Sequence, residues 1–294
     1  MPPLSERISD ILGVPLTGLR DVGGQHGYRH VTGTLADGRR VFAKVAPGPG
    51  GAAAAAFAAE ANGLRWLAEA DGGPPVPEVL GAAAEFLVIE LLEPLGGASS
   101  QAARRLGADL ARMHAAGAPS FGAPWPGYIA SLPLDNTAPG GTGEPDWGSW
   151  YAERRVLPFL RLAHDNGTLS RAEVSLTESV ISRIAELAGP PEPPSRIHGD
   201  LWSGNVLWSG GRGCLIDPAA HGGHRETDLA MLALFGAPFL AEILQGYTET
   251  APLAEGWRSR VPLHQLHPLL VHVCLFGGGY TAQLVAAARA ALEA

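Results

Sequence analysis

The chain has 294 residues, a formal net charge of −8 at pH 7 and 46% hydrophobic residues. This length allows two lobes with a substantial core, and the acidic balance without a basic block argues against a nucleic-acid partner. The two cysteines, Cys214 and Cys274, provide neither a disulfide framework nor metal-ligand spacing, which favours a reducing cytoplasm.

The first 92 residues predict a small lobe rich in strands. A short helix is expected at 4–12, strands at 19–24, 28–35, 40–45 and 86–92, and a helix at 52–70. In the third strand the side chains alternate, so Lys44 and Phe42 should share the face opposite Val41. Lys44 is the only lysine among 21 lysines and arginines. A single lysine among so many arginines suggests a site that needs a compact ammonium rather than a planar guanidinium. The alternative is that this lysine is present by chance.

The rest of the chain predicts a larger, mostly helical lobe at 93–294. Helices are expected at 99–116, 147–166, 170–188, 227–235, 238–248 and 260–292. The segment 269–288 has no charged residue and is long enough to span a membrane. Three glycines at 277–279 interrupt it, so we expect two buried helices around a glycine joint and no membrane partner. The predicted fold class is α+β and bilobal, with an antiparallel sheet and one helix in the N-terminal lobe.

Three polar residues, Asp200, Asn205 and Asp217, frame a predicted β-hairpin. Two apolar runs, 206–208 and 214–216, are separated by a glycine-rich turn at 209–213. The hairpin should bring Asn205 close to Asp217, with Asp200 on the loop just before it. Such oxygen ligands suit Mg²⁺ beside a general base. The alternative is that all three are ordinary turn residues.

The parts follow one another in the order of a phosphoryl-transfer site: a glycine turn, a lysine, a helical glutamate, then Asp, Asn and Asp. On the ATP side, the backbone at Gly23 and Gly24 would approach phosphates, Lys44 would bind phosphate oxygens, and Glu60 would pair with Lys44. The alternative for Glu60 is a solvated position on its helix.

On the other side of the predicted site, Asn205 and Asp217 would hold Mg²⁺. Asp200 would accept the proton of an attacking hydroxyl. His198 would brace the loop that carries Asp200.

The run His198-Gly-Asp-Leu-Trp-Ser-Gly-Asn205, followed by Asp217-Pro-Ala, resembles the fructosamine kinase (ketosamine 3-kinase) family. This family is related to aminoglycoside and choline kinases within the protein-kinase-like fold. The Leu-Trp-Ser-Gly insertion and the run from Arg225 to Met231 narrow the resemblance to this family. Further similar segments at 128–136, 154–158 and 263–280 extend it over most of the chain.

The resemblance implies ATP- and Mg²⁺-dependent phosphorylation of a sugar hydroxyl on a ketosamine of fructosamine or ribulosamine type, consistent with deglycation repair. It leaves open whether the ketosamine is free or protein-bound, and it leaves the oligomeric state open. The glycine turn departs from the family at Gln25 and His26, whose roles also stay open. Adenine would lie near Glu90, Leu91 and Leu92. The residues implied in substrate binding are Trp202, His221, Glu226 and Asp228.

Two other functions remain possible on the sequence. One is an aminoglycoside or other small-molecule phosphotransferase, which shares the catalytic residues. Its polycationic substrate would need clustered acids, and only Glu226, Asp228 and Glu242 are grouped in the sequence nearby. The other is a non-catalytic pseudokinase that acts as a binding module, which would lack a lysine, a base or a metal ligand, whereas this chain has all three.

Overall fold

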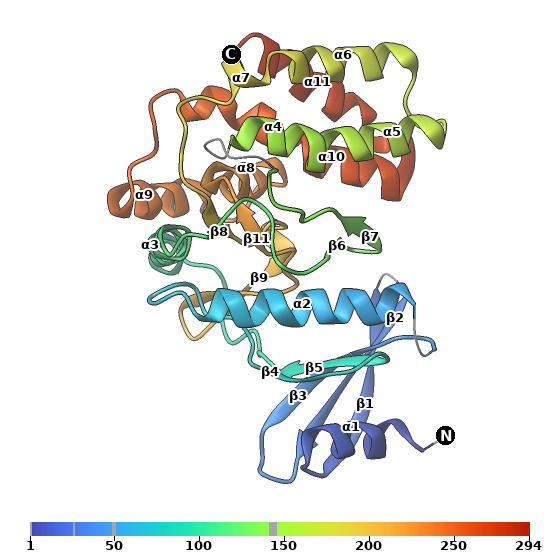
Figure 1. The fold of residues 1–294 in the computed structure, drawn as a ribbon. Coiled ribbons are helices and arrows are strands. Elements are labelled where there is room, and N and C mark those ends of the chain that lie inside the picture. Colours follow the sequence, from blue (N-terminus) through green and yellow to red (C-terminus); the bar gives the residue numbers. More distant parts are fainter. Residues whose placement is uncertain (1, 26, 49–50, 141–145) are drawn as a thin grey trace.

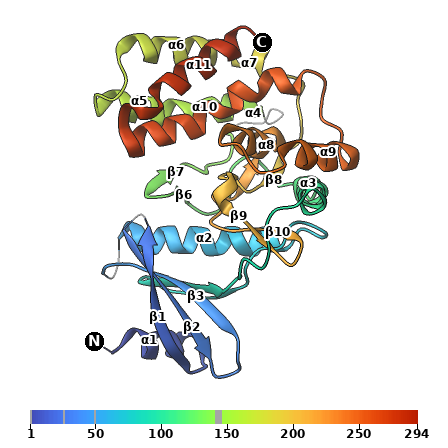
Figure 2. The ribbon, with the colours of Figure 1, turned by 180° about the vertical axis from the view of Figure 1, so that it is seen from behind.

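The computed structural model describes residues 2–25, 27–48, 51–140 and 146–294. It has a smaller N-terminal lobe built on an antiparallel sheet and a larger, mostly helical C-terminal lobe (Figure 1), as predicted. Helix α2 (Ala52–Ala68) lies between the sheet and the C-terminal lobe in both views (Figures 1 and 2). This position brings one face of α2 to the junction of the lobes.

The N-terminal sheet has the strand order β1-β2-β3-β5-β4. Because successive side chains of a strand point to opposite faces, the sheet contributes to two hydrophobic cores. One face packs Val31, Val41 and Val45 with Ile8 of α1, and the other packs Leu87 and Ile89 against α2. The elements are α1 (Leu4–Leu12), β1 (Leu16–Gln25), β2 (Tyr28–Leu35), β3 (Arg40–Val45), α2 (Ala52–Ala68), β4 (Val79–Ala82) and β5 (Phe86–Glu90).

The β-hairpin predicted after Asn205 is confirmed. Strands β9 (Val206–Ser209) and β10 (Arg212–Leu215) pair in antiparallel fashion. Gly210 and Gly211 between them both have positive φ, 56° and 73°, as a tight two-residue hairpin turn requires. A second ladder joins β8 (Ser195–Ile197) to β11 (His221–Gly223), and a third joins β6 (Gly127–Ile129) to β7 (Leu132–Leu134).

Close helix packing supports this platform. Helix α3 (Ser100–Ala115) and helix α9 (Leu240–Thr250) meet at Gly107 and Gly246. A Cβ atom at either glycine would lie 1.9 Å from a backbone oxygen of the facing helix. The remaining helical elements are α4 (Trp147–Tyr151), α5 (Leu157–Asp165), α6 (Arg171–Ser182), α7 (Ile184–Leu187), α8 (Arg225–Leu234), α10 (Trp257–Phe276) and α11 (Thr281–Leu292).

The prediction of two helices around a glycine joint is also confirmed. Helices α10 and α11 pack on each other across a 3₁₀ turn at Gly277–Tyr280. By length and composition alone the segment Trp257–Leu292 could cross a membrane. In the fold, however, Leu263, Leu270 and Val273 of α10 lie in the core of the C-terminal lobe.

The predicted helix at 147–166 is divided. A π-helical turn at Ala152–Val156 separates α4 from α5. Pro158 has no N–H to donate, so the Arg154 carbonyl loses its usual helical partner. The Arg155 side chain, Nη1 3.2 Å from that oxygen, donates to it instead. The predicted helix at 170–188 is likewise divided, at Arg183.

Candidate active site

A cavity of about 300 Å³ lies between the lobes and collects most of the predicted catalytic residues. The N-terminal lobe contributes residues of β1, β2, β3 and α2 to its wall. The C-terminal lobe contributes residues of β6, of the loop after β8 and of the segment after the hairpin. The predicted site residues that line it are Lys44, Glu60, Asp200, Trp202, Asn205 and Asp217.

Lys44 makes three ionic hydrogen bonds, two within the N-terminal lobe to Glu60 and one across the lobes to Asp217. Its Nζ lies 2.8 Å from Glu60 Oε1, 2.8 Å from Glu60 Oε2 and 2.8 Å from Asp217 Oδ1. Burial lowers the pKa of Lys44, but the charges of Glu60 and Asp217 outweigh burial and raise that pKa above its usual value. The ammonium is therefore firmly charged, and all three of its protons face carboxylate oxygens.

The Asp217 backbone is held in an unusual conformation. Its φ is 55°, in the left-handed region that non-glycine residues rarely adopt. Such strain concentrates at functional sites, where the surrounding structure maintains it. Here the preceding Ile216 is tied on both sides, because its N–H donates to Asn205 O at 3.1 Å and its carbonyl accepts from His198 Nε2 at 2.9 Å.

His198 has the geometry of a brace between the two halves of the site. Its Nδ1 accepts from the Asp200 N–H at 3.2 Å, while Nε2 bonds Ile216. Burial lowers the pKa of His198, so the ring is neutral and can donate from one nitrogen while accepting at the other. The ring fixes the loop of Asp200 relative to Asp217.

Asp200 and Asn205 form the third part of the site. Asn205 Nδ2 donates to the Asp200 carbonyl at 2.8 Å and to its Oδ2 at 3.2 Å. Burial, together with the negative charge of Asp217, raises the pKa of Asp200 to about 8. Two neighbouring carboxylates beside a carboxamide are the hard-oxygen donor set that a divalent cation such as Mg²⁺ prefers. The residues therefore fit the metal that a kinase would use.

Trp202 stands at the cavity wall, 37% exposed. A Cβ atom on Gly204 would lie 2.2 Å from the Trp202 ring. The indole therefore packs directly over Gly204. This explains physically why a tryptophan and a glycine occur two residues apart in the sequence motif.

The other residues predicted to contact ATP lie outside the described wall of the cavity. Gly23 and Gly24 are in β1 beside the β1–β2 turn, and Glu90, Leu91 and Leu92 lie at or after the end of β5. None of these five lines the described wall of the cavity, although neighbouring Gln25 does. At Gly24 a Cβ atom would lie 2.3 Å from Tyr28 O, so this position needs glycine. Their contacts with ATP stay a prediction.

The predicted substrate contacts of His221, Glu226 and Asp228 need correction. All three are buried, with 4%, 2% and 0% exposure, and none lines the described wall of the cavity. His221 Nδ1 lies 2.8 Å from the Ala219 carbonyl. Asp228 accepts from the N–H groups of His198 at 2.7 Å and Gly199 at 2.9 Å. Asp228 and His221 support the segments beside Asp200, and none of the three side chains faces the described cavity.

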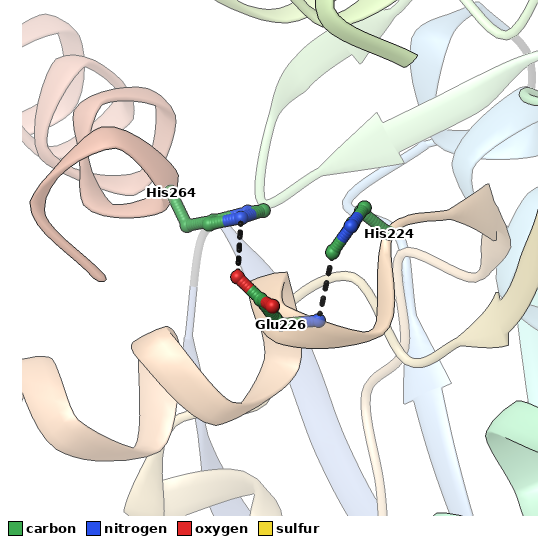
Figure 3. Close-up of side chains that lie close together, drawn as sticks. All are labelled: His224, Glu226 and His264. Atoms are coloured by element: carbon green, nitrogen blue, oxygen red, sulfur yellow. Dashed lines mark hydrogen bonds and ion pairs between the residues drawn. The ribbon is translucent and has the colours of Figure 1, made fainter. Parts of the chain in front are cut away.

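Glu226 belongs to a buried cluster on α8 and α10. Possible ligand atoms of His224, Glu226 and His264 lie within 4.8 Å of one another (Figure 3). However, both Glu226 oxygens accept hydrogen bonds from Arg260, at 2.5 and 2.9 Å. The guanidinium already neutralises this carboxylate, so the cluster is an internal ion pair.

Several residues of the site were not predicted. Tyr28, Phe57 and Tyr128 line the cavity. His114 of α3 holds Asp228 through a 3.1 Å contact and bonds Tyr247 at 2.8 Å. Of these residues, only Tyr128 could have been identified from the sequence, because it begins the segment 128–136 that resembles the family.

A family model described as fructosamine kinase matches residues 13–294. The chain belongs to the fructosamine kinase family. The predicted resemblance is thus confirmed, as is the enzyme class, an ATP-dependent phosphotransferase that acts on a sugar hydroxyl of ketosamines.

Similar proteins come from distant bacteria. A protein of Enterococcus faecium named "probable ketoamine kinase" is 35% identical over 78% of this chain and 80% of its own length. One from Synechocystis with the same name is 36% identical over 77% and 75%. A solved structure from Thermobifida fusca, named fructosamine-3-kinase, is 50% identical, covers 99% of both chains and has a TM-score of 0.94.

More distant solved structures bear only on the fold. An aminoglycoside phosphotransferase bound to gentamicin is 13% identical, with a TM-score of 0.64 over 100% of this chain and 98% of its own. This likeness confirms the predicted protein-kinase-like fold.

Proposed function

We propose that this chain transfers the γ-phosphoryl group of ATP to a sugar hydroxyl of a fructosamine- or ribulosamine-type ketosamine, with Asp200 as the general base. One observation carries the proposal: Lys44, Asp200, Asn205 and Asp217 surround a single cavity whose wall includes Trp202. Family membership supports the ketosamine as acceptor. Phosphorylating such an adduct is consistent with a role in deglycation repair.

On the nucleotide side, Lys44 would bind phosphate oxygens as a point charge, and Glu60 would keep its ammonium in place. Asn205 and Asp217 would hold Mg²⁺, which when bound neutralises charge on the phosphates. The backbone at Gly23 and Gly24 would cover the phosphates. Adenine would lie near Glu90, Leu91 and Leu92.

On the acceptor side, Asp200 would accept the hydroxyl proton. Burial and Asp217 raise the pKa of Asp200, so its ionised carboxylate is a stronger proton acceptor than an exposed one. Asn205 orients the carboxylate through its 3.2 Å contact to Oδ2. Trp202 would contact the sugar or its substituent.

A polycationic aminoglycoside is a poorer fit as acceptor. Within the described wall of the cavity the carboxylates are Glu60, Asp200 and Asp217, and each has a role in the reaction. The nearby acids Glu226 and Asp228 are buried and hydrogen-bonded. No carboxylate in the described wall is thus left to bind extra ammonium groups.

We also propose a cytoplasmic location, where ATP is available, and a free or protein-bound ketosamine as the sole class of partner, without nucleic acid or membrane.

The test is phosphate transfer from γ-labelled ATP to a ribulosamine, a fructosamine and kanamycin, each with the phosphorylated carbon determined. The proposal expects labelled ketosamine and background transfer to kanamycin. Transfer to kanamycin alone would support the aminoglycoside function. Background turnover with all three would support the pseudokinase.

A further inference from the structure

A second cavity, of about 260 Å³, opens beside the first. The two share Asp200 and Trp202, so the proposed base stands where they meet. Lys44, Glu60 and Asp217 line only the first cavity. The second cavity therefore extends from the base away from the residues proposed to hold the phosphates.

Aromatic rings form much of the wall of this second cavity. The Trp202 and Phe235 rings meet edge to face with centroids 6.3 Å apart. The His272 ring lies 4.9 Å from Phe235, 5.5 Å from Phe276 and 4.8 Å from Tyr280. Because these rings are tilted relative to one another, the cavity presents both ring faces and ring edges, and another aromatic ring can pack against either.

The described wall of the second cavity is nearly without charge. Asp200 is its one carboxylate, and it contains no lysine or arginine. Burial lowers the pKa of His272, so that ring is neutral at pH 7. Away from Asp200, an ionic substituent would therefore lose water in this cavity without gaining a partner of opposite charge.

The glycine joint positions two of these rings. Gly277 has a φ of 77° and a ψ of −158°, a conformation that side-chain-bearing residues rarely adopt. It ends α10 directly after Phe276 and starts the turn that presents Tyr280. Phe276 is 59% exposed, so its ring is accessible to a ligand in this cavity.

We propose that this second cavity, lined by Trp202, Phe235, His272, Phe276 and Tyr280, binds the amine substituent of the ketosamine and selects flat apolar groups such as a benzyl group. The inference rests on the proposed function, in which a sugar hydroxyl faces Asp200. The amine of a ketosamine is separated from the sugar hydroxyls by only a few bonds. Its substituent therefore leaves the base in the direction that the phosphates do not occupy.

The test uses three fructosamines that differ only in the amine: benzylamine, ethanolamine and 1,5-diaminopentane. We expect kcat/KM at saturating ATP to be at least about ten-fold higher for the benzylamine adduct than for the ethanolamine adduct, as is typical when an apolar pocket is filled. The diaminopentane adduct, which carries a second cation, should do no better than the ethanolamine adduct.

Two variants connect this preference to the cavity. Phe276→Leu and Tyr280→Leu should each reduce the benzylamine-to-ethanolamine ratio at least about three-fold, because stacking is lost while an apolar side chain remains. The matched control is Phe239→Leu, which removes a 43% exposed phenyl ring that lines neither cavity. It should leave the ratio unchanged. Thermal melts would verify that all three variants fold.

Equal kcat/KM for the three adducts, a preference for the diaminopentane adduct, or an unchanged ratio in Phe276→Leu would each overturn this inference while leaving the proposed function standing. Failure to phosphorylate any of the three would overturn both.

Discussion

The exchange Lys44→Arg keeps the positive charge yet should be strongly damaging. Three carboxylate oxygens converge on one nitrogen at 2.8 Å each, and the Lys44 side chain is only 10% exposed. An ammonium offers three protons from one point, whereas a guanidinium offers a planar fork and needs more room.

The magnitude follows from that geometry. Losing one charge-assisted bond to Glu60 or Asp217 costs about 1.5–3 kcal/mol, and forcing a larger head group into a packed site costs about 1–3 kcal/mol. Together these predict a loss of roughly 3–5 kcal/mol in the free energy of unfolding. Misplacing the phosphate-binding charge should also lower kcat on the order of 100-fold.

Urea unfolding and steady-state kinetics with varied ATP would measure both effects. The control is the reverse exchange, Arg39→Lys, at the exposed ion pair with Asp37. It should leave the stability close to that of the wild type, because this pair is exposed to solvent. Wild-type stability together with wild-type ATP kinetics in Lys44→Arg would refute this account of the lysine.

Two further predictions concern packing and charge. Gly204→Ala should push the Trp202 ring from its place, since the new Cβ would lie 2.2 Å from it. KM for the ketosamine should rise while KM for ATP stays the same. An unchanged ketosamine KM would count against Trp202 as a substrate contact. Burial raises the pKa of Glu226, but the 3.4 Å contact with His264 and the hydrogen bonds from Arg260 outweigh burial and lower that pKa to about 2 from an ordinary 4.5. Because the folded-state pKa is the lower one, ionised Glu226 stabilises the fold above about pH 4.5, and this contribution is lost as the pH falls toward 2. Glu226→Gln should therefore cost roughly 3 kcal/mol at pH 7 and less than half of that at pH 3, as chemical denaturation at the two pH values would measure; an equal cost at both would contradict the ion pair.

Local sequence patterns were enough to predict the centre of the site. The two-residue period of a strand placed Lys44 on the face opposite the valines, and this face packs against α2. The hairpin turn brought Asn205 close to Asp217, because its two glycines permit the positive φ angles of a tight reversal. In both cases a short stretch of chain determined the geometry.

The surroundings of the site depend on distant partners and could not be predicted. Glu226 and Asp228 resemble solvent-exposed acids in the sequence, because unpaired carboxylates are seldom buried. They are buried here because Arg260, 34 residues later, and His114, 114 residues earlier, compensate them. The division of the helix expected at 147–166 could not be predicted from the sequence either. A proline such as Pro158 can end a helix or, as here, follow a π-helical turn within it.

The most direct test of the central claim is a comparison of the wild-type protein with Asp200→Asn in transfer of phosphate to a fructosamine. Loss of the base should reduce kcat on the order of 10²–10⁴-fold. Nucleotide binding, measured separately by calorimetry, should be nearly unchanged, because Lys44 and Glu60 remain in place. An Asp200→Asn enzyme that turns over at the wild-type rate would contradict the assignment of Asp200 as the base.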